Sequence, residues 1–168
     1  IGIFSAIQAI VHPGDEVIIF DPSYDSYSPS VQLVGAKAVH IALNAPEFSV
    51  DWNQVKDAIS AKTRMIIVNT PHNPTGAIWS KQDWLNLIEL IEDKNIIVLS
   101  DEVYEHLIFD RHKHYSALSF PELRHRSFVV GSFGKTFHVT GWKTGYCVAA
   151  PELMKVFRQV YQFANFCG

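Results

Sequence analysis

Hydrophobic positions along the chain follow two alternating patterns. Short continuous apolar runs, rich in valine and isoleucine, are typical of strands buried on both faces. Between them, apolar residues recur every three or four positions, as on one face of an amphipathic helix. The apolar runs predict strands at 16–20, 38–42, 65–68, 96–99, 127–130 and 144–149, and the periodic segments predict helices at 3–11, 24–34, 52–60, after Ser80 and from Pro151.

This alternation predicts an α/β fold with three α/β/α layers and a mostly parallel sheet. Ligands of such sheets bind at the carboxyl ends of the strands. Three polar clusters directly follow predicted strands, at 69–76, 100–104 and 132–135. We therefore expect these three clusters to form one site, while residues 105–126 are expected to be irregular.

Composition narrows the classes of function. The chain has 168 residues, 48% of them hydrophobic and 18% charged, as in an ordinary globular domain with a core. A net charge of −3 gives no electrostatic footprint for nucleic acid. No apolar run reaches the roughly 18 residues of a membrane-spanning helix, and no signal peptide is visible. Because the two cysteines, Cys147 and Cys167, suit a reducing compartment, we expect a cytoplasmic protein.

The two ends of the sequence predict a fragment of a longer protein. The chain opens without an initiator methionine and already has helical periodicity at Ile1-Gly2-Ile3. Helix-like sequence continues through the last residues, 163–168. We therefore expect both ends to cut through elements of secondary structure.

A lysine in a turn after the fifth predicted strand is the first candidate for chemistry. Lys135 lies in Ser132-Phe133-Gly134-Lys135, and a second lysine follows in Gly141-Trp142-Lys143-Thr144-Gly145. Partial burial at a strand end would lower the pKa of Lys135 and free its amine to form a Schiff base. A solvated loop lysine is the plainer alternative.

The three polar clusters contain what an aromatic, phosphorylated aldehyde cofactor requires. Such a cofactor needs an amine for the aldehyde, a carboxylate for the ring nitrogen and donors for the ring hydroxyl. It also needs an aromatic face for the ring, and cations or hydroxyls for the phosphate. In that order, the candidates are Lys135, Asp101, Asn73 with Tyr104, Tyr24, and Ser132 with Lys143.

The chain resembles the pyridoxal-phosphate aminotransferases of fold type I, class I/II. The motifs that carry the resemblance are Asn73-Pro74-Thr75-Gly76, Asp101-Glu102-Val103-Tyr104 and the two lysine segments, in the order of the family and over nearly the whole chain. Within that family the chain is similar to the methionine and kynurenine aminotransferases. Three segments support this narrower match: Asp21-Pro22-Ser23-Tyr24-Asp25-Ser26-Tyr27, Asn69-Thr70-Pro71-His72-Asn73-Pro74 and Gly141-Trp142-Lys143.

This resemblance implies a cofactor and a role for each residue. Lys135 would hold pyridoxal 5'-phosphate as an imine and then move a proton during catalysis. Asp101 would pair with the pyridinium nitrogen. The remaining roles are hydrogen bonds to the ring oxygen from Asn73 and Tyr104, stacking by Tyr24, and phosphate binding by Ser132 and Lys143. Many family members have an arginine at the position of Lys143, where a lysine offers a point charge in place of a fork.

The resemblance also implies the reaction and the partners. An amino group would pass from an amino acid, with methionine, aromatic or kynurenine-like side chains expected, to a 2-oxo acid in a homodimer. Residues 1–168 would be the cofactor-binding large domain, without the family's glycine-containing phosphate loop upstream and its arginine-bearing small domain downstream. A C–S β-lyase on the same scaffold and a catalytically incomplete cofactor-binding or dimerising fragment remain alternatives.

Plainer structural roles stand beside these assignments. Asp101 could cap a turn, Asn73 is a good turn residue before proline, and both tyrosines could be core or interface aromatics. Six histidines invite a metal site, but their spacing matches no known ligand pattern, so we expect surface and loop histidines and no metal. These histidines are His72, His106, His112, His114, His125 and His138.

Overall fold

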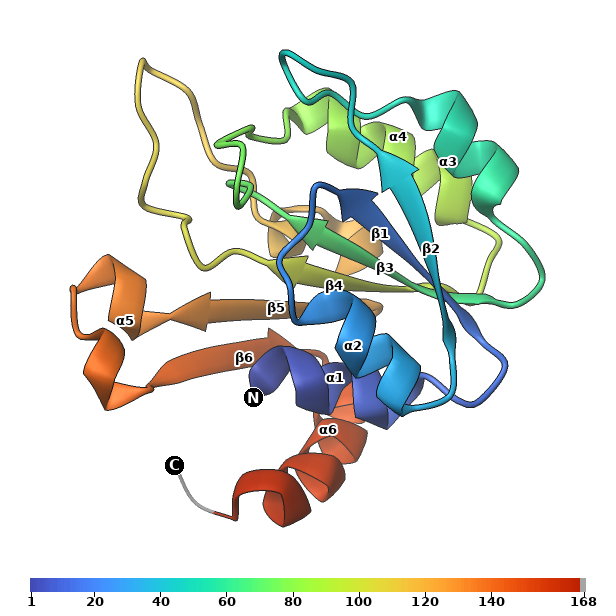
Figure 1. The fold of residues 1–168 in the computed structure, drawn as a ribbon, viewed down its shortest axis with the longest axis vertical. Coiled ribbons are helices and arrows are strands. Elements are labelled where there is room, and N and C mark those ends of the chain that lie inside the picture. Colours follow the sequence, from blue (N-terminus) through green and yellow to red (C-terminus); the bar gives the residue numbers. More distant parts are fainter. Residues whose placement is uncertain (167–168) are drawn as a thin grey trace.

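The computed structural model of the chain describes residues 1–166 and contains a six-stranded sheet between two layers of helices (Figure 1). The strand order is β2-β1-β3-β4-β5-β6, with β1 to β5 parallel and β6 antiparallel to β5. This confirms the predicted α/β fold with a mostly parallel sheet. The strands are β1 (Glu16–Asp21), β2 (Lys37–Ala42), β3 (Thr63–Asn69), β4 (Ile97–Asp101), β5 (Ser127–Ser132) and β6 (Gly145–Ala149).

Helices cover both faces of this sheet, as Figure 1 shows. On one face lie α3 (Trp52–Ala58) and α4 (Lys81–Ile91), with the short 3-10 turns η1 (Ala117–Ser119) and η2 (Pro121–Leu123). On the other face lie α1 (Gly2–Ile10), α2 (Tyr27–Leu33) and α6 (Pro151–Asn165). Two further short elements, α5 (Phe133–Thr136) and η3 (Thr140–Trp142), connect β5 to β6.

The continuous apolar runs divide between two cores because successive strand side chains point to opposite faces. In β1, Ile18 and Phe20 pack into the core under α3 and α4, whereas Val17 and Ile19 pack into the core under α1, α2 and α6. Two well-covered faces explain why these strands lack polar alternation. Among residues 1–166, no helix is both long and apolar enough to cross a membrane.

Three local expectations differ from the structure. The segment 105–126, expected to be irregular, contains η1 and η2. The predicted helix at 24–34 begins only at Tyr27, because a turn, closed by a hydrogen bond from the Tyr27 N–H to the Tyr24 carbonyl (3.2 Å), precedes it. The expected turn around Lys135 is instead the single helical turn α5. Ser132 caps this turn by accepting a hydrogen bond from the Gly134 N–H (3.1 Å).

Candidate active site

A cleft of about 800 Å³ lies at the edge of the sheet where β3, β4 and β5 end. Ligand sites of enzymes typically have this size. The three polar clusters meet there, as expected from the parallel order of these strands. All seven candidate residues line the cleft: Tyr24, Asn73, Asp101, Tyr104, Ser132, Lys135 and Lys143.

Asp101 forms the deepest polar point of the cleft, with only 5% of its surface exposed. Its Oδ2 accepts a hydrogen bond of 2.6 Å from the Tyr27 hydroxyl, and its Oδ1 accepts one of 3.2 Å from the Val103 N–H. Burial raises the pKa of the Asp101 carboxyl, although both hydrogen bonds oppose the rise. Asp101 forms no ion pair among the described residues, so a buried carboxyl faces the cleft without a cation.

Asp101 and the floor of the cleft that it forms are held in place by two residues that are not among the seven candidates. Tyr27 donates to Asp101, and burial followed by the Asp101 charge raises the pKa of its hydroxyl, which keeps the donor proton in place. Asn69 ends β3 directly beside Asp101 in the sheet register. The Asn69 amide donates to the Asp101 carbonyl (2.9 Å), and its Oδ1 accepts from the Asn73 N–H (2.7 Å). Asn69 thereby fixes the loop that carries Asn73 to the end of β4.

Lys135 lies above this floor on α5. Its Nζ is 5.9 Å from the centroid of the Tyr104 ring, within the range of a cation–π contact. The expected partial burial of Lys135 is wrong: the residue is exposed, because α5 stands at the rim of the cleft. The Tyr104 hydroxyl and the Asn73 side-chain amide make no hydrogen bond within residues 1–166, which leaves both as donors to a ligand.

Ser132 and Lys143 lie at the β5–β6 end of the cleft. The Ser132 oxygen accepts from Gly134, so its hydroxyl proton remains to be donated outward. Lys143 is exposed and has a left-handed backbone, with φ of 56°, where η3 ends. Together they offer one hydroxyl and one cation to an anion.

Tyr24 stands at the opposite rim, in the loop between β1 and α2. Its ring is 43% exposed and meets the Tyr27 ring edge to face, with centroids 5.6 Å apart. The Tyr24 ring is therefore in contact with a neighbour whose hydroxyl binds Asp101. An aromatic ligand placed over Asp101 would meet this tyrosine.

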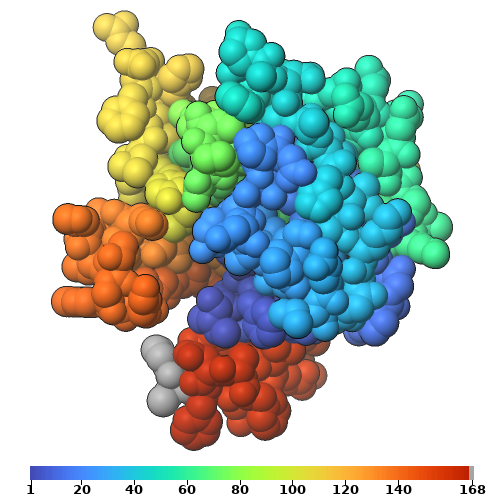
Figure 2. Space-filling model, in the orientation of Figure 1, coloured from blue at the N-terminus to red at the C-terminus, as the bar shows by residue number. Residues whose placement is uncertain are grey.

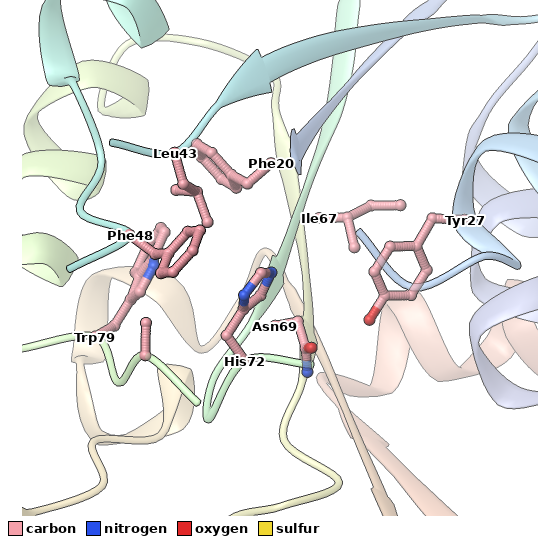
Figure 3. A pocket seen from close by; sticks show the side chains of 9 residues that line it. Phe20, Tyr27, Leu43, Phe48, Ile67, Asn69, His72 and Trp79 are labelled. Atoms are coloured by element: carbon pink, nitrogen blue, oxygen red, sulfur yellow. The ribbon is translucent and has the colours of Figure 1, made fainter. Parts of the chain in front are cut away.

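A second, much smaller cavity lies behind the loop at the end of β3 (Figure 3). Its volume is about 10 Å³, enough for one water molecule and no more. Figure 3 shows His72 and Asn69 in its wall, with Trp79 and Phe48 on one side and Tyr27 on the other. This cavity is too small for a ligand, so the cleft is the candidate site.

Two of the six histidines are not surface residues. His72 is buried, its Nδ1 lies 2.7 Å from the Thr75 Oγ1, and burial lowers its pKa. His114 is largely buried against Glu102, with Nε2 to Oε2 at 2.9 Å. The ligand-type atoms of His114, Glu102 and Glu105 lie within 4.8 Å of one another. None of these three residues lines the cleft. Sequence spacing gave no sign of this group, because a loop brings it together.

Cys147 is half-buried in β6 and lines the apolar side of the cleft. Burial raises the pKa of its thiol to about 12, so the thiolate is scarce near neutral pH. A thiol of this kind is a poor nucleophile. The other cysteine, Cys167, lies outside the described residues.

The geometry suits the group that the resemblance implies. A buried carboxyl without a cation fits a protonated ring nitrogen, because a buried charge requires a partner. Donors remain available on Asn73 and Tyr104, an aromatic face on Tyr24, and a cation with a hydroxyl on Lys143 and Ser132. The amine of Lys135 lies next to Tyr104 on the same wall of the cleft.

Comparisons with known proteins give a consistent result. The family described as aminotransferase class I and II matches residues 2–168. The methionine aminotransferase of Escherichia coli is 48% identical over 98% of this chain, and kynurenine–oxoglutarate transaminase 3 of Rattus norvegicus is 41% identical over 95% of it. The chain spans 42% and 37% of the length of these two relatives.

A solved structure agrees with the fold in detail. YbdL from Escherichia coli, described as having a methionine aminotransferase function, superposes with a TM-score of 0.96 at 47% identity. The match covers 98% of this chain and 44% of that one. The predicted resemblance, including its methionine and kynurenine branch, is thereby confirmed.

Proposed function

Because the chain belongs to the class I and II aminotransferases, we propose that it binds pyridoxal 5'-phosphate in the cleft and transfers an amino group from an amino acid to a 2-oxo acid. The observation that carries this proposal is the convergence of all seven candidate residues on one cleft of about 800 Å³. In this proposal, residues 1–168 form the large cofactor-binding domain of a homodimeric enzyme in the cytoplasm.

Each side chain then has one task. Asp101 accepts the ring N–H and keeps that nitrogen charged, while Tyr27 and Val103 hold the carboxylate in place. Asn73 and Tyr104 donate to the ring oxygen, and Tyr24 stacks on the ring. Ser132 and Lys143 bind the phosphate.

Lys135 performs the covalent and proton-transfer chemistry. When bound, the cofactor supplies an aldehyde that captures an amine and a ring that withdraws electrons. The Lys135 Nζ would hold the cofactor through its aldehyde and, as a free amine, would accept a proton from the substrate and return it. In the overall reaction the donor amino acid would become a 2-oxo acid, and the acceptor 2-oxo acid would become an amino acid.

We propose methionine, aromatic or kynurenine-like amino acids as the donors. The support is the similarity to a methionine aminotransferase and to a kynurenine transaminase, together with an apolar side of the cleft. That side includes Ile3, Cys147, Met154 and Phe157. It suits an uncharged side chain better than a carboxylate.

Reduction of the chain with borohydride tests the cofactor role of Lys135. The chain is incubated with pyridoxal phosphate, reduced and digested, and mass spectrometry identifies the modified residue. Before reduction we expect the parent chain to be yellow and the Lys135→Ala variant to be colourless. After reduction we expect the label of the parent chain on Lys135. Lys56→Ala, an exposed lysine on α3, is the matched control and should keep the colour. If the chain takes up no pyridoxal phosphate, the proposed function is refuted.

The products distinguish transfer from elimination. To test transfer, the chain loaded with pyridoxal phosphate is incubated with methionine and a 2-oxo acid, and the new amino acid is measured. To test elimination, it is incubated with a cysteine conjugate, and pyruvate and ammonia are measured. A new amino acid supports the aminotransferase. Pyruvate and ammonia alone would assign a C–S β-lyase instead, and neither product would assign a cofactor-binding domain without turnover.

A further inference from the structure

The loop 103–116 leaves the sheet directly after Asp101 and carries Tyr104 into the cleft. Figure 2 shows this loop, in yellow, projecting from one edge of the molecule. Its middle is exposed, with Leu107 at 48% and Phe109 at 71%. Because so little of the loop is packed, its position must be set at its two ends.

Both ends of the loop meet at Glu102. At the start, the Glu102 carbonyl accepts a hydrogen bond of 2.9 Å from the Glu105 N–H. At the end, the Glu102 carboxylate reaches His114, with Oε2 to Nε2 at 2.9 Å, and accepts from the Ala117 N–H at 2.9 Å. The Ser100 hydroxyl adds a hydrogen bond of 2.8 Å to the same carboxylate. Glu102 is only 1% exposed, so these contacts are shielded from water.

The ligand-type atoms of Glu102 and Glu105 and the Nε2 atom of His114 have hydrogen-bond partners within the protein, whereas the His114 Nδ1 is buried without one among the described residues. Both oxygens of Glu102 have partners, and Glu105 accepts from the Tyr146 hydroxyl. A cation would have to displace the contact between His114 and Glu102. Hydrogen bonding is therefore the assignment that the geometry favours.

We propose that His114 is a positioning residue, which closes loop 103–116 onto Glu102 and thereby holds Tyr104 beside Lys135 in the cofactor cleft. This inference rests on the proposed function, because Tyr104 is placed there as a donor to the cofactor ring. The contact spans twelve residues of sequence and is the side-chain bond that closes them, while the Ala117 N–H holds the segment that follows. Tyr104 is the second residue after Glu102, and its ring lies 5.9 Å from the Lys135 Nζ.

Amide hydrogen exchange of the chain without cofactor tests the closure. His114→Leu removes the donor, His114→Gln retains one, and His112→Ala is the matched control, because His112 is an exposed histidine in the same loop. We expect residues 103–107 to exchange about tenfold faster in His114→Leu, and within about twofold of the parent in the other two. Equal exchange in His114→Leu and the parent chain would overturn the inference.

A double-mutant cycle tests whether the closure acts through Tyr104. We expect His114→Leu to weaken pyridoxal phosphate binding about fivefold in the parent chain, and less than about twofold in the Tyr104→Phe background. The dissociation constants come from spectroscopic titration. The same fivefold loss in both backgrounds would leave His114 with a merely structural role and would overturn the inference.

Two controls separate the remaining outcomes. Exchange of residues 103–107 should be unchanged by zinc or by EDTA; slowing by zinc that EDTA reverses would assign the group to a cation and overturn the hydrogen-bonded closure. If the parent chain binds no pyridoxal phosphate, the proposed function fails, and with it the cofactor role of His114. Exchange in the three histidine variants then decides the closure of the loop by itself.

Discussion

Asp101 and Glu102 are neighbours in the sequence and are both buried at the end of β4, yet their surroundings differ. Asp101 points to the face of α1 and α2, where its partners are two neutral donors, the Tyr27 hydroxyl and the Val103 N–H. Glu102 points to the opposite face, where a histidine, a hydroxyl and a backbone N–H surround it. The fold gives Glu102 a histidine partner, whereas among the described residues Asp101 has no cationic partner.

This difference separates stability from function. A carboxylate that the fold satisfies stabilises the folded chain, and its loss should be seen in unfolding experiments. A buried carboxylate without a cation costs stability, and it persists where binding requires it. Substitutions at the two positions should therefore have opposite effects on unfolding and unequal effects on the cofactor.

Cofactor binding should show the largest contrast. Asp101→Asn removes the negative charge that we propose pairs with the ring nitrogen. We therefore expect pyridoxal phosphate to bind about 100-fold more weakly, as for the loss of a charged hydrogen bond. Glu102→Gln should weaken it less than about tenfold. Spectroscopic titration measures both. Similar losses in the two variants would refute the assignment of Asp101 to the ring nitrogen.

Stability should show the reverse order. Glu102→Gln replaces one carboxylate oxygen by an NH2 group, which faces either the donor His114 or the donors Ser100 and Ala117. We expect the free energy of unfolding to fall by about 2–3 kcal/mol, the cost of leaving buried polar groups unpaired. Urea unfolding followed by circular dichroism measures it. Glu92→Gln at the exposed end of α4 is the control and should change little.

Much of the fold could be predicted from the sequence because its signals are local. An apolar run such as Met65-Ile66-Ile67-Val68 is a strand signature by itself, and Ser80 marks the start of α4 through its capping box with Asp83. The antiparallel direction of β6 could not be predicted this way. Strand direction depends on the path of the chain through α5 and η3, and an apolar run has the same pattern in both directions.

The meeting of the candidate residues in one cleft could be predicted from the sequence, but the surroundings of each residue could not. The motifs select Lys135, Asp101 and Asn73, and strand ends bring them together. Tyr27 was not among the candidates, because its bond to Asp101 joins residues 74 positions apart. The exposure of Lys135 was also missed, since burial depends on what surrounds a residue in space. A contact across the sheet has no counterpart in local sequence patterns.

Tyr27 supports Asp101 from behind, and its removal should give a smaller effect than removal of the carboxylate. Tyr27→Phe deletes the 2.6 Å hydrogen bond that opposes the burial-driven rise in the pKa of Asp101. The carboxyl should then hold its proton more firmly and pair less well with a ring N–H. We expect about tenfold weaker binding of pyridoxal phosphate at neutral pH. Tyr115→Phe, which changes a tyrosine outside the cleft, should leave the dissociation constant unchanged.

The smallest effect should be a gain in stability from Asp101→Asn without cofactor. Burial raises the pKa of Asp101 above that of the unfolded chain, so the folded state binds the proton more tightly. The stability from this protonation is fully present below the unfolded pKa, about 3.9, and is lost as pH rises through the raised folded value. At neutral pH the parent chain therefore contains a costly buried charge, which the asparagine avoids while it still bonds to Tyr27 and Val103. We expect the free energy of unfolding of Asp101→Asn to exceed that of the parent chain by about 1 kcal/mol at neutral pH. This difference should shrink toward zero in acid. Urea unfolding across this pH range measures the difference. A loss of stability at neutral pH would mean that the neighbours of Asp101 stabilise its charge as fully as those of Glu102 do.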